Sequence, residues 1–126
     1  MTTARQAILD AMSEAELQAL IVSEAQQHGW LVHHDQANTP VQRADGSIHR
    51  RTVSNGDPGF PDLVMARGGT TVVVEVKRKG GRFRPGQREW LAALGARVCY
   101  PADVDGLIAF LRRPPKVPAR TGTDGG

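Results

Sequence analysis

The fold is decided by residues 62–77, which read DLVMARGGTTVVVEVK. Two apolar runs, the second rich in valine, flank the pair Gly68-Gly69. Short β-forming runs separated by two glycines predict a β-hairpin with a two-residue loop. In such a hairpin Arg67 pairs with Thr70, and this pair fixes the register of both strands.

Counting back along both strands from that pair places Asp62 directly opposite Glu75. Opposed side chains have Cβ atoms roughly 5 Å apart, and like charges at that separation destabilise a sheet. Lys77 lies two residues beyond Glu75 and therefore leaves the same face of the strand. A divalent cation bridging both carboxylates would remove the repulsion, and hard oxygen ligands favour Mg²⁺ or Mn²⁺. The alternative is that Asp62 ends a turn after Pro61 while Glu75 and Lys77 form a salt bridge.

Elements on either side of the hairpin complete the predicted architecture. A helix begins at Ser13, where Ser13 and Glu16 fit a capping box. We expect further strands at residues 30–34 and 97–100, further helices at 85–94 and 103–112, and a long connection at 38–59 that could hold a short strand at 48–53. This order predicts an α/β fold with a mixed central sheet flanked by helices.

The 126 residues fit a single domain. We assign residues 1–12 to an N-terminal lead-in, residues 13–113 to the domain, and residues 114–126 to a disordered tail. The sequence lacks an apolar run long enough to span a membrane and lacks the apolar stretch of a signal peptide, which favours a soluble, cytoplasmic protein, or one in the host cytoplasm if viral. The single cysteine, Cys99, excludes an internal disulfide and a multi-cysteine zinc site.

The charge pattern is compatible with a polyanionic partner. The formal net charge is +3 and the sequence pI is about 9.6, a mild excess that does not establish such a partner. Basic residues gather at Arg50-Arg51 and along residues 77–88. A basic run of this kind is usually a solvated face, and contact with DNA phosphates is the functional alternative.

Four short motifs resemble a known nuclease family. Pro61-Asp62 followed by Glu75-Val76-Lys77 is the PD-(D/E)XK signature, and the stretches GFPDL (59–63), EVK (75–77), GGRF (80–83) and PGQREWL (85–91) resemble the VRR-NUC family. The resemblance extends over residues 13–112 and looks like the free-standing viral (phage) and bacterial members. It implies a restriction-endonuclease-like fold and a homodimeric endonuclease. Such an enzyme hydrolyses phosphodiester bonds of branched, flap or junction DNA in replication, repair or recombination.

The resemblance also implies roles for particular residues. Asp62 and Glu75 would bind Mg²⁺ or Mn²⁺, with the backbone carbonyl of Val76 as a further ligand. Lys77 would position the attacking water, and Gln87 would support the site. The remaining candidates are Gln18 or Glu14 from the first helix, and the DNA-binding residues Lys79, Arg82, Arg84, Arg88, Arg50 and Arg51. Two features depart from the family pattern: Arg84 stands where a small hydroxyl residue is common, and the connection over residues 38–59 is long.

Two other functions remain open on the sequence alone. One is a non-catalytic DNA-binding or assembly module with the nuclease fold. The opposed carboxylates argue against it, because a catalytically inactive domain would have no reason to keep them. The other is a toxin-like or restriction-type subunit that needs a partner. Of the remaining notable residues, Trp30 and Trp90 are expected in the core and Cys99 in a buried strand. At most one of His33 and His34 can face the site, because alternate strand residues point to opposite faces.

Overall fold

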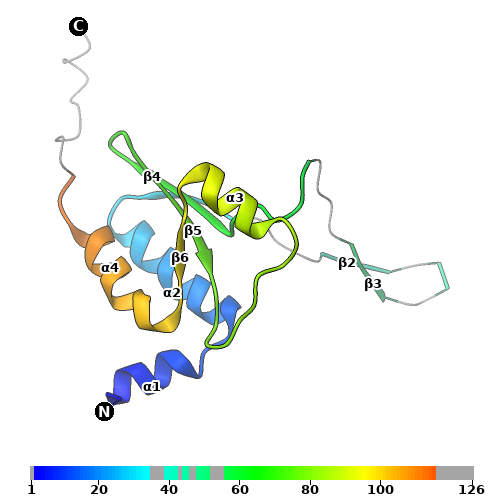
Figure 1. Ribbon diagram of the computed structural model, residues 1–126, viewed down its shortest axis with the longest axis horizontal. Coiled ribbons are helices and arrows are strands. Elements are labelled where there is room, and N and C mark those ends of the chain that lie inside the picture. Colours follow the sequence, from blue (N-terminus) through cyan, green and yellow to red (C-terminus); the bar gives the residue numbers. More distant parts are fainter. Residues whose placement is uncertain (1, 35–38, 43, 46–47, 52–55, 116–126) are drawn as a thin grey trace, which may run out of the picture.

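A computed structural model describes residues 2–34, 39–42, 44–45, 48–51 and 56–115. The elements, in chain order, are α1 (Ala4–Asp10), α2 (Glu14–Gln27), β1 (Leu31–His34), β2 (Thr39–Gln42), β3 (Ile48–Arg51), β4 (Leu63–Arg67), β5 (Thr70–Val76), α3 (Gln87–Leu94), β6 (Arg97–Cys99), the 3-10 turn η1 (Pro101–Asp103) and α4 (Val104–Arg112). The main sheet has the order β1-β4-β5-β6, with β6 parallel to β5 and the other neighbours antiparallel. The predicted mixed α/β fold is therefore confirmed (Figure 1).

The hairpin formed by β4 and β5 has the predicted register. Arg67 pairs with Thr70, and the pairing continues without a bulge to the first residue of β4. The next positions outward on the two strands are Asp62 and Glu75. Gly68 and Gly69 have φ values of 55° and 82°. A two-residue type I′ turn requires positive φ at both positions, and glycine adopts it without strain, so this pair of residues sets the register.

The two faces of β5 have different partners. Val72, Val74 and Val76 are buried in the hydrophobic core together with apolar residues of α2 and α4. These two helices lie side by side (Figure 1), and their buried residues are Leu17, Ile21, Ala25, Val104, Leu107, Ile108 and Leu111. Glu75 alternates with the valines and faces the other way, where Gln87 of α3 contacts it. Glu75 thus lies on the face of the sheet opposite the core helices, where α3 approaches it.

Arg67, at the end of β4, ties the ends of both core helices together. Its guanidinium donates to the carbonyl of His28 after α2 at 3.1 Å and to that of Leu111 in α4 at 3.3 Å. It also lies over the Trp30 ring, 4.5 Å from the centroid. Trp30 is 4% exposed, and its Nε1 donates to the same Leu111 carbonyl at 2.9 Å, so its predicted core position is confirmed.

The structure adds a helix and a strand to the expected architecture. The lead-in contains α1, whose Leu9 is buried in the common core, so this helix packs as part of the same body. The connection over residues 38–59 contains β2, which pairs with β3 in a separate two-stranded sheet (Figure 1). Pro40 in β2 is tolerated there because both strands of such a sheet are edge strands. Residues 52–53 of the expected strand and residues 116–126 of the expected tail lie outside the described residues.

Candidate active site

Glu75 is a buried carboxylate near the end of β5, an interior strand of the sheet. Its residue is 1% exposed. Its Oε2 accepts a hydrogen bond from Gln87 Nε2 at 2.9 Å and lies 3.3 Å from Lys77 Nζ. Its Oε1 is buried and has no hydrogen-bond partner in the described part of the chain. An unpaired buried carboxylate oxygen costs free energy, so this atom favours a ligand that can coordinate it.

Asp62 immediately precedes β4 and lies beside Glu75. It follows the buried Pro61 and is itself partly buried. Its Oδ2 accepts a hydrogen bond from the backbone N–H of Val76 at 2.9 Å. This bond fixes the Asp62 carboxylate to the end of β5, next to the residue that carries the second carboxylate.

The two carboxylates interact electrostatically. The pKa of Glu75 is raised from 4.5 to about 7, chiefly by burial and next by the negative charge of Asp62, while the positive charge of Lys77 opposes the rise. Close to neutral pH, Glu75 therefore exchanges readily between its neutral and charged forms. A positive charge at the free oxygen would favour the charged form.

Lys77 is held rigidly on the same face of β5. The residue is 1% exposed. Its Nζ donates to Gln87 Oε1 at 2.8 Å and to the carbonyl of Arg82 at 3.0 Å. The ring of Phe83 lies 5.3 Å from the same nitrogen. A buried ammonium persists only with partners of this kind, so its position is determined by the residues around it.

Gln87, the first residue of α3, connects these groups. The side chain is buried, and its Oε1 accepts from both Lys77 Nζ and the backbone N–H of Arg84, the latter at 2.7 Å. Its Nε2 donates to Glu75. One amide thus holds the lysine, the glutamate and the preceding loop in a fixed arrangement.

The predicted basic residues surround this site unevenly. The loop between β5 and α3 carries Lys79, Arg82 and Arg84, which are exposed, and Arg88 follows on α3. The Arg88 guanidinium lies over the Phe83 ring at 4.5 Å, on a side chain that also borders Lys77. Lys79 Nζ lies 3.5 Å from Asp10 Oδ2 of α1. Arg50 and Arg51 lie on β3, and their side chains are outside what the structure describes.

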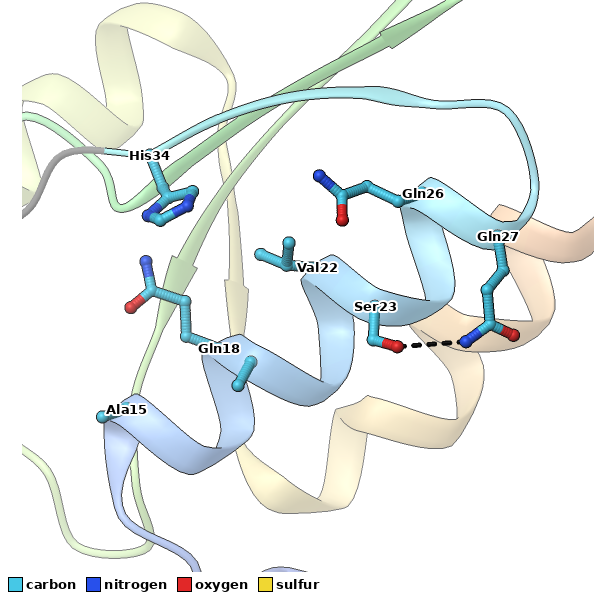
Figure 2. Close-up of a pocket in the computed structure, with 8 residues that line it drawn as sticks. Ala15, Gln18, Val22, Ser23, Gln26, Gln27 and His34 are labelled. Atoms are coloured by element: carbon cyan, nitrogen blue, oxygen red, sulfur yellow. Dashed lines mark hydrogen bonds between the residues drawn. The ribbon is translucent and has the colours of Figure 1, made fainter.

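The two first-helix candidates face different surroundings. Glu14 borders the loop after β5, because a Cβ on Gly81 would lie 3.3 Å from Glu14 Oε2. Gln18 instead lines a groove of about 610 Å³ along α2, where it and Gln26 project toward His34 (Figure 2). His34 pairs with Leu63, a core residue, so this groove lies on the core side of the sheet. Among the described residues, neither candidate hydrogen-bonds to Asp62, Glu75 or Lys77.

Three participants were not predicted from the sequence. Phe83 contacts Lys77 and Arg88 through its ring, and Gly59 packs against Gly86. Nothing in the sequence distinguishes Phe83 as a residue of the site. The glycines could have been noticed, because a glycine next to the Asp62 and Gln87 motifs often permits close approach of two backbone segments.

The described ranges contain no cluster of three or more histidine, cysteine, aspartate or glutamate side chains able to hold a metal. The donor set at this site consists of the carboxylates of Asp62 and Glu75 with neighbouring backbone oxygens.

Within the described ranges, no helix is both long and apolar enough to cross a membrane.

A mixed sheet that carries adjacent Asp and Glu residues, with a lysine two positions after the glutamate, defines the class of PD-(D/E)XK nuclease-like proteins. The model of the VRR-NUC domain matches residues 4–104. The chain therefore belongs to the VRR-NUC family, and this membership implies a nuclease-type function in DNA processing. No curated protein and no solved structure matches the chain.

Proposed function

We propose that the protein is a divalent-metal-dependent endonuclease that hydrolyses phosphodiester bonds in branched, flap or junction DNA. The observation that carries this proposal is the buried Glu75, whose Oε1 lacks a hydrogen-bond partner among the described residues while Asp62 and Lys77 stand next to it. An inert module would gain nothing from a buried carboxylate beside a second one, because both burial and repulsion oppose its ionisation.

The donor atoms present fit Mg²⁺ or Mn²⁺. Asp62 and Glu75 offer carboxylate oxygens, and the backbone carbonyl of Val76 is a candidate third ligand. Hard oxygen donors of this kind suit these ions better than softer metals. When bound, such an ion supplies Lewis-acid activation of water and neutralises charge at the phosphoryl group.

The residues around the carboxylates would act mainly by positioning. Lys77 would orient the attacking water or neutralise negative charge that develops on the phosphate. Gln87 supports this role because it holds Lys77 Nζ at 2.8 Å and Glu75 Oε2 at 2.9 Å. The backbone N–H of Val76 holds the Asp62 carboxylate in place through a hydrogen bond. Of the first-helix candidates, Glu14 would act from beside the loop after β5, and Gln18 would act from the groove along α2.

DNA would be held through its phosphates. Arg82, Arg84 and Arg88 are exposed around the site, and Lys79 could exchange Asp10 for a phosphate. Arg50 and Arg51 of β3 would extend this surface. Phosphate contacts give binding that weakens with salt and carries no direct sequence preference.

The proposed enzyme acts as a homodimer, which would present two such sites to a branched substrate. Sedimentation velocity would detect the dimer.

The test compares the parent protein with Asp62→Ala and Lys77→Ala on branched, flap and linear DNA in Mg²⁺ and Mn²⁺. Asp105→Ala is the matched control, because Asp105 is exposed on α4 and pairs with Arg5. We expect the first two variants to lose at least about 100-fold in cleavage rate and the control to cleave normally. A folded Asp62→Ala protein that cuts at the parent rate would refute the mechanism. Calorimetry without detectable Mg²⁺ or Mn²⁺ binding to the parent would favour the non-catalytic module.

A further inference from the structure

Two glycines bring the segment before Asp62 into direct backbone contact with the start of α3. A Cβ added at Gly59 would lie 2.4 Å from the carbonyl carbon of Gly86 and 2.5 Å from the backbone nitrogen of Gln87. A Cβ added at Gly86 would lie 2.2 Å from the carbonyl oxygen of Pro58. Neither position can hold a side chain without moving backbone. Both glycines also have positive φ, 98° and 86°, which other residues adopt only with strain.

Trp90 reinforces this contact one turn further along α3. Its Nε1 donates to the carbonyl of Asp57 at 3.2 Å. Its ring meets the ring of Phe60 edge-on, with centroids 5.0 Å apart. Residues 57–60 are therefore held on α3 at several consecutive points, and the Gly59–Gly86 contact is the one that involves only backbone.

The location of the contact gives it consequences for the site. Gly59 lies three residues before Asp62, and Gly86 immediately precedes Gln87. Gln87 makes the hydrogen bonds to Glu75 and Lys77 at 2.9 and 2.8 Å. The contact therefore sets how closely the helix that carries the amide approaches the strand ends that carry the carboxylates.

We propose that the Gly59–Gly86 contact positions Gln87 relative to Asp62 and Glu75, and that Gly59 and Gly86 are positioning residues of the nuclease. This inference rests on the proposed function of the site. A β-carbon at either glycine would separate α3 from the segment before Asp62. The hydrogen bonds that Gln87 makes to Glu75 and Lys77 would then lengthen or break.

The experiment compares Gly59→Ala with Gly95→Ala. Gly95 ends the same helix, also has positive φ (62°), and has no atom within 4 Å of an added Cβ, so it measures the backbone strain alone. We expect Gly59→Ala to lower kcat on branched DNA at least about 100-fold with KM changed less than about threefold, because a small misplacement affects chemistry more than binding. Gly95→Ala should keep the parent kcat.

A double variant tests whether the effect passes through Gln87. If it does, the protein that carries both Gly59→Ala and Gln87→Ala should cleave no more slowly than the slower single variant. Multiplication of the two losses would instead show that Gly59 acts independently of Gln87, and would overturn the proposal.

A second readout does not depend on catalysis. The side-chain amide signal of Gln87, followed by NMR, should shift in Gly59→Ala and stay in place in Gly95→Ala. If the parent protein cuts no DNA, the proposed function fails while this signal still tests the contact. If Gly59→Ala does not fold, Trp90→Phe replaces it. This substitution adds no atom but removes the hydrogen bond that holds residues 57–60 on α3 through Asp57. We expect the Gln87 amide signal to shift in this variant too. An unchanged Gln87 signal in the folded variant overturns the inference.

Discussion

The free energy of unfolding should fall as the pH rises from about 4.5 to about 7, and Glu75 should be the cause. Burial, together with the charge of Asp62, raises the pKa of Glu75 from 4.5 to about 7 in the folded protein. The folded state thus holds this proton more tightly than the unfolded state does. The resulting stabilisation is complete below pH 4.5 and is lost as the pH passes through 7. A shift of this size corresponds to roughly 3 kcal/mol.

The measurement is urea unfolding between about pH 3 and pH 8 without divalent ions, followed by tryptophan fluorescence. The decline above pH 4.5 should be absent in Glu75→Gln, which keeps an acceptor for Gln87 and cannot ionise. Glu24→Gln is a control of opposite sign. A hydrogen bond from Arg112 lowers the pKa of Glu24, so the stability it contributes is present above pH 4.5 and is lost as the pH falls. This variant should therefore be destabilised at neutral pH more than at low pH.

A parent-like decline in Glu75→Gln would refute this explanation. Mg²⁺ provides an independent check on the same group. Coordination requires the charged carboxylate, so added Mg²⁺ should raise the free energy of unfolding more at pH 8 than at pH 5. Equal stabilisation at both pH values would show that the ion binds elsewhere.

Three further predictions concern the scaffold and the DNA surface. Ser13→Ala removes the hydroxyl of the α2 capping box and should cost about 1 kcal/mol by thermal unfolding; an unchanged Tm would show that the cap contributes nothing. Leu17→Ala truncates a side chain that is 0% exposed and should cost roughly 2–5 kcal/mol by urea unfolding, whereas a loss below 1 kcal/mol would contradict its place in the core. Arg84→Ala should lower by about 1 the slope of log binding constant against log salt concentration for DNA. The exposed Arg5 of α1 provides the control, and equal slopes for Arg84→Ala and Arg5→Ala would argue against a phosphate contact.

The hairpin could be predicted from the sequence because its determinants are local. Gly68-Gly69 selects the turn, and the turn fixes which residues of the two strands are opposite. The proximity of Asp62 and Glu75 then follows from counting. The capping box at Ser13 is equally local, since both its hydrogen bonds lie within four consecutive residues.

What could not be predicted depends on residues distant in the chain. Arg67 has no predicted role beyond its pairing with Thr70, yet it donates to carbonyls at the ends of two helices that the sequence gives no means to bring together. β2 is only four residues long and contains Pro40, which favours a loop until a partner strand is known. Glu14 and Gln18 are one helical turn apart, yet one borders the loop after β5 and the other lines the groove along α2. This difference depends on how α2 packs on the sheet, which the spacing of the two residues does not reveal.

The hydrogen bonds of Lys77 limit how this lysine can take part in the proposed reaction. An ammonium has three donors. Two of them are used by Gln87 Oε1 and the Arg82 carbonyl, and the next acceptor, Glu75 Oε2, lies 3.3 Å away. A water molecule or phosphate could therefore contact Lys77 only by replacing one of these three. The Glu75 contact is the longest, and it loses its value once another positive charge neutralises that carboxylate, so it would be the first to exchange. In the metal-free protein Lys77 would therefore pair with the ionised form of Glu75, and it would become available to substrate only when that carboxylate acquires a different partner.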